Sequence, residues 1–469
     1  MSPRAVQVHR GVVYGQLADP RDRFSALVDP VAGASGQPAA FPQRPGALDW
    51  LLGPALAELP QREDAFQLNI WAPNGASGLP VLFYIPGGAF ISGAGTVRWY
   101  DGTRLAEEGQ CVVVSVNYRL GILSHAGGIG GGNLGVGDLV QALRWVGKNI
   151  AGYGGGAENL TMVGQSAGAF YAFLLSQLEQ TRGMIARTAL LSLAFQPPLG
   201  TSEAAERRRI IAEELGRSTA VDATGEELLD AQQCVSRAYA GKGLGIMPTA
   251  DDMVPADLFD VRAAAQRLHV GDLLLTHTAQ EASAFLGQAP EAAFGPGAVA
   301  GFIGAHFEDV PEVAEHLAAE HPGSPKSQLI GAMTLHQFES YAAELVLAVG
   351  KAGKQVSSVR FDYAAKDSRM GSAHGFDVPF LFGNRLDWSD APMLEGTSDE
   401  DFEQVGGHLR SLILGFVASG WAGTPMPTAP KPQDGGVAHG YALDAHGLRS
   451  IPLETRFGAK RPVQKVSGG

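Results

Sequence analysis

The sequence predicts an α/β fold, in which a central, mostly parallel, twisted sheet is flanked by helices. Short apolar runs of strand length alternate with longer segments of helical periodicity, as expected for strands that are linked by helices. The apolar runs are nearly continuous, which is typical of strands buried on both faces. Hydrophobic residues make up 45% of the 469 residues and charged residues 18%, enough apolar material for one large core.

Eight segments have the composition of strands. Two are expected to be antiparallel strands at the sheet edge, 12–16 and 66–71, and six are expected inside the sheet: 81–85, 112–116, 160–163, 188–192, 272–276 and 358–363. Four segments are expected to be helical: 138–150, 203–215, 328–349 and 402–419. In the first of these helices, one face carries Leu139, Leu143, Val146 and Ile150.

The most informative motif is the run Gly164-Gln165-Ser166-Ala167-Gly168. A strand-like segment precedes it and a helix-prone segment follows, which is the strand–turn–helix context of a nucleophile elbow. The glycines are needed because side chains beside the serine would clash in so sharp a turn. We therefore predict that Ser166 is a nucleophile; the alternative is a glycine-rich loop that merely contains a serine.

A serine nucleophile needs an acid and a histidine, which follow this motif in that order. Among the 12 histidines, His374 stands apart, because the small residues of 371–375 let it project from a loop at a strand end. Glu281 ends a strand-like run, and an α/β sheet presents its active site at the carboxyl ends of its strands. The residues alone leave each of these two open between a catalytic and a structural role.

Seven blocks in the expected order resemble the type-B carboxylesterase/lipase family, in particular its bacterial para-nitrobenzyl-esterase-like branch. They are 63–73 (EDAFQLNIWAP), 80–90 (PVLFYIPGGAF), 116–121 (VNYRLG), 133–155, 164–169, 276–285 and 371–383. The resemblance implies an α/β-hydrolase fold that spans residues 1–469 as a single domain, with cap-like helical insertions around 200–260 and 290–350. It also implies that Ser166, Glu281 and His374 form a catalytic triad.

A tetrahedral intermediate on a serine carries a negative oxygen, which needs two or three fixed N–H donors. Ala167, directly after the nucleophile, is expected to supply one of them from its backbone. The turn at 87–89 is expected to supply the others, from Gly88 and Ala89. Pro86 stands where the family usually has histidine, but it precedes the expected donors and need not abolish the oxyanion hole.

The chain also departs from the family pattern. Ala65 stands where the family usually has cysteine, and Gln165 where it usually has glutamate. A short segment around 23–27 replaces a longer family stretch, which leaves the depth of the active-site gorge open. Glu63, Asp64, Arg119 and Asp138 are charged residues that could be catalytic, but the resemblance implies that they form structural ion pairs, with Glu63 and Arg119 the first expected pair.

Charge and composition exclude several classes of function. A net charge of −13 without a basic block makes nucleic acid an unexpected partner. No apolar run is long enough to cross a membrane, and the first ten residues lack the apolar core of a signal peptide. Cys111 and Cys234 give no disulfide framework, so a cytoplasmic location is expected. We expect no cofactor and no metal ion, and leave the oligomeric state open.

These observations predict a serine carboxylesterase that hydrolyses neutral carboxylic esters through an acyl-enzyme. The main alternative is an amidase or carbamate hydrolase that uses the same residues. A non-catalytic, cholinesterase-like binding protein is less expected, because such relatives typically lose the serine. Should Glu281 not be the acid, Asp272 and Asp377 are the next candidates.

Overall fold

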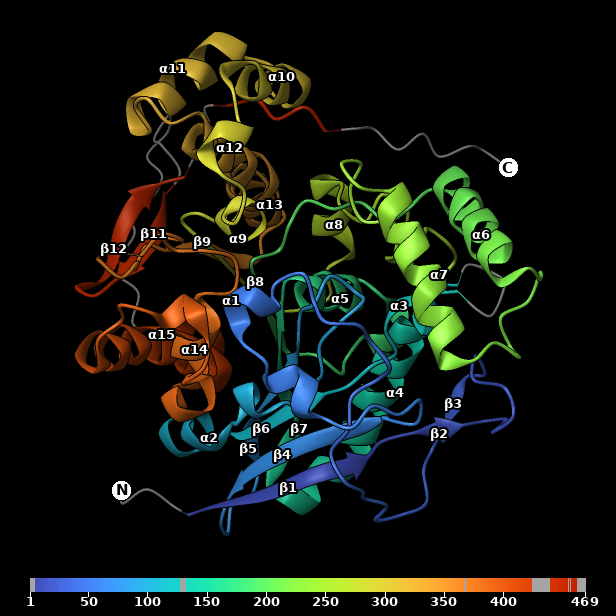
Figure 1. Cartoon of the computed structure of the whole chain (residues 1–469). Helices are drawn as coiled ribbons and strands as arrows, with labels where there is room; N and C mark the ends of the chain where they lie inside the picture. The colour runs from blue at the N-terminus through green and yellow to red at the C-terminus, as the bar shows by residue number, and fades with distance from the viewer. Residues whose placement is uncertain are drawn as a thin grey trace.

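A ten-stranded sheet forms the centre of the molecule (Figure 1). In spatial order its strands are β1 (Val6–Val13), β4 (Gln67–Pro73), β6 (Val112–Val116), β5 (Leu79–Ile85), β7 (Gly155–Gln165), β8 (Arg187–Leu191), β9 (Asp272–Thr278), β10 (Gln355–Phe361), β11 (His439–Asp444) and β12 (Gly447–Pro452). A separate small sheet pairs β2 (Gln16–Leu17) with β3 (Leu27–Val28). This computed structural model describes residues 5–126, 132–366, 368–423, 439–453, 455 and 457–461.

The strands from β6 to β11 all run parallel, and the antiparallel pairs lie at the two ends of the sheet: β1 with β4, β4 with β6, and β11 with β12. The predicted fold class and all six predicted inner strands are confirmed. The prediction that 66–71 forms an edge strand is wrong, because β4 lies between β1 and β6. The hairpin of β11 and β12 extends the sheet beyond β10 and was not predicted.

Helices cover both faces of the sheet (Figure 1). They are α1 (Asp49–Leu52), α2 (Thr103–Gly109), α3 (Gly121–His125), α4 (Leu134–Asn149), α5 (Ala167–Leu175), α6 (Thr201–Leu215), α7 (Gly225–Ala238), α8 (Val261–Arg267), α9 (Ser283–Leu286), α10 (Pro296–His306), α11 (Val310–Glu320), α12 (Pro325–Thr334), α13 (Ser340–Lys351), α14 (Asp377–Phe382) and α15 (Asp399–Ser419). The helix predicted over 328–349 is interrupted, because a π-helical turn, Leu335–Glu339, separates α12 from α13. Within the described ranges, no helix is long and apolar enough to cross a membrane.

Two hydrophobic clusters sandwich the sheet. On β5, Val81, Phe83 and Ile85 belong to one cluster, while Leu82 and Tyr84 belong to the other, since successive strand side chains point to opposite faces. The first cluster packs against α4, α5 and α13, and the second against α2, α14 and α15. A third, smaller cluster joins α10, α11 and α12 away from the sheet.

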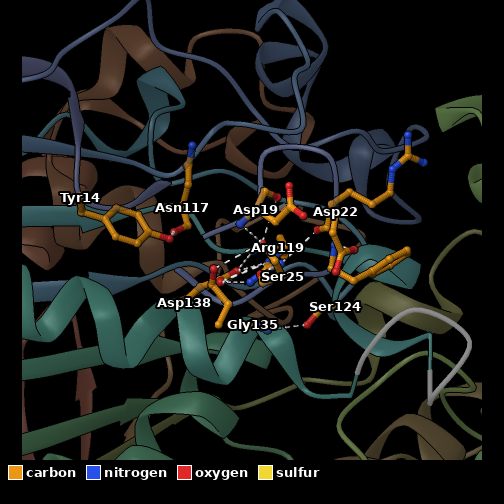
Figure 2. Close-up of polar contacts among 12 residues, drawn as sticks. Tyr14, Asp19, Asp22, Ser25, Asn117, Arg119, Ser124, Gly135 and Asp138 are labelled. Atoms are coloured by element: carbon orange, nitrogen blue, oxygen red, sulfur yellow. Dashed lines mark hydrogen bonds and ion pairs between the residues drawn. The ribbon is translucent and has the colours of Figure 1, made fainter. Parts of the chain in front are cut away.

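A buried ion pair between Arg119 and Asp138 ties the N-terminal segment to the sheet (Figure 2). Arg119 Nε and Nη2 donate to the Asp138 carboxylate at 2.9 and 2.6 Å, and Nη1 donates to the carbonyl oxygens of Arg23 and Ser25 at 3.1 and 2.9 Å. The expected pair between Glu63 and Arg119 is wrong, because Glu63 pairs with Arg23 at 3.1 Å. Asp138 also accepts the Arg119 backbone N–H at 2.9 Å, so both of its carboxylate oxygens are hydrogen-bonded despite their burial.

Replacing Asp138 with Asn should lower the free energy of unfolding by about 3–5 kcal/mol, because it leaves a buried guanidinium without its counter-charge. The two side chains are 2% and 0% exposed, so water cannot compensate. Urea unfolding followed by circular dichroism measures the change. The matched control is Glu179→Gln, whose ion pair with Arg182 is exposed and should contribute far less. Equal stability of the two variants would contradict this account of the pair.

Candidate active site

The chain turns sharply between β7 and α5, and Ser166 is the residue at the turn. Its backbone has φ 56° and ψ −120°, a conformation that residues other than glycine rarely adopt. The Ser166 N–H donates to the Leu191 carbonyl oxygen of β8 at 2.9 Å, and the Ser166 carbonyl oxygen accepts from the Phe170 N–H at 3.0 Å. These two bonds hold the strained turn, and Ser166 lines a cavity above it.

The two glycines of the turn are required by close backbone contact. A Cβ atom on Gly164 would lie 2.2 Å from the carbonyl oxygen of Gly168, and a Cβ atom on Gly168 would lie 2.0 Å from the carbonyl oxygen of Ile85. No side chain fits into such spaces, so the start of α5 can pack directly against the end of β5 only with glycine there. The predicted strand–turn–helix context of Ser166 is therefore present.

Glu281 and His374 meet at the carboxyl ends of β9 and β10. His374 Nδ1 donates to Glu281 Oε2 at 2.5 Å, and the Thr278 N–H donates to Glu281 Oε1 at 2.8 Å. Glu281 is fully buried, so the carboxylate is fixed by these two donors. His374 lines the same cavity as Ser166.

The structure does not join Ser166 directly to His374. Among the described residues no hydrogen bond links the Ser166 hydroxyl to the imidazole, and the side-chain nitrogen of Gln165 lies 3.4 Å from His374 Nε2. Nucleophile and base are often further apart in a ligand-free site than in the reacting complex. Phe285 and Phe338 flank the imidazole, with ring centroids 5.3 and 5.7 Å from it.

The two reserve candidates for the acid lie in different places. Asp272 is the first residue of β9, at the opposite end of that strand from Glu281, and cannot reach His374. Asp377 begins α14, three residues after His374, and is fully buried. Burial, and then the charge of Glu281, raises the pKa of Asp377 from 3.8 to about 7.

The loop after β5 has an unusual backbone conformation and borders the cavity. Gly88, Ala89 and Phe90 have φ values of 128°, 51° and 66°, an uncommon run of positive values. The Gly88 carbonyl oxygen accepts from the N–H groups of Ile91 and Ser92, each at 3.0 Å, which stiffens the loop. Within the described part of the chain, the N–H groups of Gly88, Ala89 and Ala167 donate no hydrogen bond, and all three residues line the cavity.

The cavity has a volume of about 310 Å³ and mainly apolar walls. Part of the wall comes from residues of 46–56, for which we made no prediction. Leu48, Leu52 and Leu56 line it, but α1 ends at Leu52 and Gly53-Pro54 interrupt the segment, so no helical periodicity in the sequence indicated this wall. Asp49 is the only acidic side chain among the lining residues the structure describes, and none of them is lysine or arginine.

Comparisons with known proteins show the family and the fold of the chain. A model of the carboxylesterase family matches residues 4–422. A probable N-octanoylanthranilate hydrolase from Rhodococcus erythropolis is 31% identical over 413 residues, covering 84% of each chain. The para-nitrobenzyl esterase of Bacillus subtilis is 28% identical over 404 residues, covering 79% of this chain and 77% of its own. A crystal structure of a Geobacillus stearothermophilus carboxylesterase superposes with a TM-score of 0.78 at 27% identity, covering 96% of this chain and 95% of its own.

The chain belongs to the carboxylesterase family and has its α/β-hydrolase fold. It is a serine hydrolase that acts on carboxylic esters, similar to the para-nitrobenzyl esterases. Among the described residues, no three His, Cys, Asp or Glu side chains lie close enough together to hold a metal ion.

Replacing Gly168 with Ala should abolish activity and lower the free energy of unfolding by about 1–3 kcal/mol, because the added methyl group must push α5 away from β5. The matched control is Gly147→Ala, on an exposed face of α4 with no atom within 4 Å of the new methyl group. The Gly147 change should leave activity intact and raise the free energy of unfolding by up to about 1 kcal/mol. Thermal unfolding and ester hydrolysis measure both. A Gly168 variant as active as the control would refute the packing argument.

Replacing Asp377 with Asn should remove a pH dependence of stability. The pKa of this carboxyl is about 7 in the folded protein and 3.8 without burial, so the folded state binds an extra proton between these values. The stability of the wild type therefore falls as pH rises through this window and levels off above it. The variant should gain stability relative to wild type from about pH 5 to pH 7. If the difference in unfolding free energy between the variant and the wild type stayed constant with pH, the raised pKa of Asp377 would be contradicted.

Proposed function

We propose that Ser166 is the nucleophile of this esterase, that His374 is its general base and that Glu281 orients the imidazole. The observation that carries the proposal is the 2.5 Å hydrogen bond from His374 to Glu281, at the wall of the cavity that Ser166 also lines. Because Nδ1 is engaged by Glu281, Nε2 keeps the lone pair that accepts a proton from the serine. The carboxylate also stabilises the imidazolium that forms.

The proposed reaction has two halves. The Ser166 oxygen attacks the ester carbonyl carbon while its proton passes to His374 Nε2. The tetrahedral intermediate then expels the alcohol, which leaves with the proton from His374, and the acyl group remains on Ser166. A water molecule attacks the acyl-enzyme, gives its proton to His374, and the carboxylic acid departs as Ser166 recovers its proton.

We assign the oxyanion hole to the backbone N–H groups of Gly88, Ala89 and Ala167. The support is that these donors lack acceptors among the described residues and belong to two loops that border the same cavity. Rigid loops suit this role, because donors that need no reorganisation stabilise a developing charge most effectively. Removal of one such donor typically costs about 2.7–4 kcal/mol of transition-state stabilisation.

We propose neutral carboxylic esters as substrates. An apolar cavity without lysine or arginine on its described wall gives a carboxylate-bearing substrate no counter-charge, whereas a neutral aryl or alkyl group can displace water from it. The same machinery could cleave amides or carbamates. Hydrolysis of amides or carbamates is the second candidate, and relatives named as a probable N-octanoylanthranilate hydrolase and a phenmedipham hydrolase support it.

The helices of 200–260 and 290–350 would form a cap over the catalytic sheet within one domain. The support is that both segments contribute to the cavity wall, with Leu244 from the first and Phe338 from the second. A cap of this kind would contact the substrate, while the sheet carries the reacting groups.

We also propose a cytoplasmic location. Cys111 and Cys234 are both free thiols. Burial raises the pKa of Cys111 to about 12, so this thiol is protected from reaction as well as from pairing. Free thiols and no disulfide suit a reducing compartment.

The net charge of −13 gives no reason to expect nucleic acid as a partner.

Two variants test the catalytic assignment. Ser166→Ala should lower kcat by at least about three orders of magnitude, because no nucleophile remains. Glu281→Gln should lower it by about 10³–10⁴-fold, because the imidazole loses its orienting carboxylate. Hydrolysis of an aryl ester measures both, with circular dichroism to establish folding. If the Glu281 variant kept a near-normal rate, the orienting role would move to Asp377.

A matched pair of esters tests the substrate class. Phenyl butyrate and monophenyl succinate differ chiefly in that the second carries a carboxylate at the end of its acyl chain. The neutral ester should have a kcat/KM at least about tenfold higher, since a desolvated carboxylate without a counter-charge costs more than 1.4 kcal/mol. Equal rates would contradict the account of the cavity. A phenyl carbamate that reacted faster than phenyl butyrate would favour the second candidate.

A further inference from the structure

The segment 457–461, here called the strap, crosses the cap after the residues that match the family, 4–422. In Figure 1 the red end of the chain runs beside α10 and α12. Phe457 belongs to the small cluster that these helices share. The Glu308 N–H donates to the Gly458 carbonyl oxygen, and the Lys460 N–H donates to the His306 carbonyl oxygen, each at 2.8 Å. The strap is thus built into the cap.

At the end of the strap, Arg461 connects three segments that lie behind the cavity wall: the loop after β8, the π-helical turn and α13. Its Nη1 donates to the His336 carbonyl oxygen at 2.8 Å, and its Nη2 lies 3.1 Å from a carboxylate oxygen of Glu344. The guanidinium lies over the rings of Phe195 and Tyr341, 4.3 and 5.5 Å from their centroids. A cation that contacts two aromatic faces and a carboxylate is strongly held, and the side chain is only 18% exposed.

The groups that Arg461 holds are direct neighbours of residues that line the cavity. His336 belongs to the π-helical turn Leu335–Glu339, and the next two residues, Gln337 and Phe338, both line the cavity. The Phe195 N–H donates to the Gln337 carbonyl oxygen at 2.6 Å, so the loop after β8 is tied to the same turn. π-Helical turns are locally unfavourable and depend on outside contacts to persist.

We propose that Arg461 is a positioning residue for substrate binding: it fixes the π-helical turn and thereby the part of the cavity wall formed by Gln337 and Phe338. This inference rests on the proposed function, because it treats that wall as a substrate contact. An ester large enough to fill the cavity needs this wall in place, whereas a small ester does not. Arg461 therefore determines selectivity by substrate size without touching the substrate.

The test compares phenyl acetate with 2-naphthyl butyrate, which is larger in both its acyl and its alcohol group. In Arg461→Ala, kcat/KM for 2-naphthyl butyrate should fall about 10- to 100-fold, mainly through KM, because a binding wall shifts while the reacting groups stay in place. For phenyl acetate the change should stay below about threefold. Rates are normalised to active sites titrated with a small fluorophosphonate, so a partly unfolded variant cannot imitate the effect.

Two further variants complete the test. Arg461→Lys keeps a cation over Phe195 but cannot bridge the His336 carbonyl and Glu344 together. Its kcat/KM for 2-naphthyl butyrate should therefore lie between the values of the wild type and Arg461→Ala. Arg182→Ala removes an equal charge from an exposed ion pair with Glu179 and should change kcat/KM for neither ester. If Arg461→Ala lowered kcat/KM equally for both esters, or for neither, the inference would be overturned. Failure of the fluorophosphonate to label Ser166 in the wild type would overturn the proposed function instead.

Discussion

The backbone of Ser166 is the constraint on which the rest of the site depends. A positive φ at a non-glycine residue persists only where its surroundings enforce it, and here the Leu191 carbonyl and the bare backbone of Gly168 do so. The turn lies where the strand order reverses, since β5 has β6 on one side and β7 on the other. Such a reversal opens a crevice at the carboxyl ends of the strands. The loop after β5 therefore borders the same crevice as Ser166.

The proposed acid and base reach this crevice from later strands. Because β7, β9 and β10 are parallel, Ser166, Glu281 and His374 all follow strand ends on one edge of the sheet, although Glu281 and His374 are 93 residues apart in the chain. The sheet fixes these groups, while the surrounding cavity is built from loops and cap helices. Loops and cap helices can therefore change without moving the strands that carry the proposed reacting groups.

The parts that the sequence predicted are those with a local cause. Buried parallel strands are apolar throughout, and the turn at Ser166 must carry glycine because it admits no side chains. Each feature can therefore be recognised from one short segment of the sequence. The partner of Arg119 was not predictable, because several carboxylates were available and only the packing of α4 selects Asp138. The strap and the π-helical turn escaped prediction for a similar reason: their contacts join residues more than one hundred positions apart, as between Arg461 and His336, 125 apart.

The central claim is that ester hydrolysis passes through an acyl group on Ser166, and trapping that species tests it most directly. The wild-type enzyme is mixed with excess 4-nitrophenyl butyrate, quenched in acid within the first turnovers and digested for peptide mass spectrometry. The account predicts a butyryl group on the peptide that contains Ser166, in an amount that approaches one per chain if deacylation is the slower step. Nitrophenol release with the acyl group on a residue other than Ser166 would contradict it.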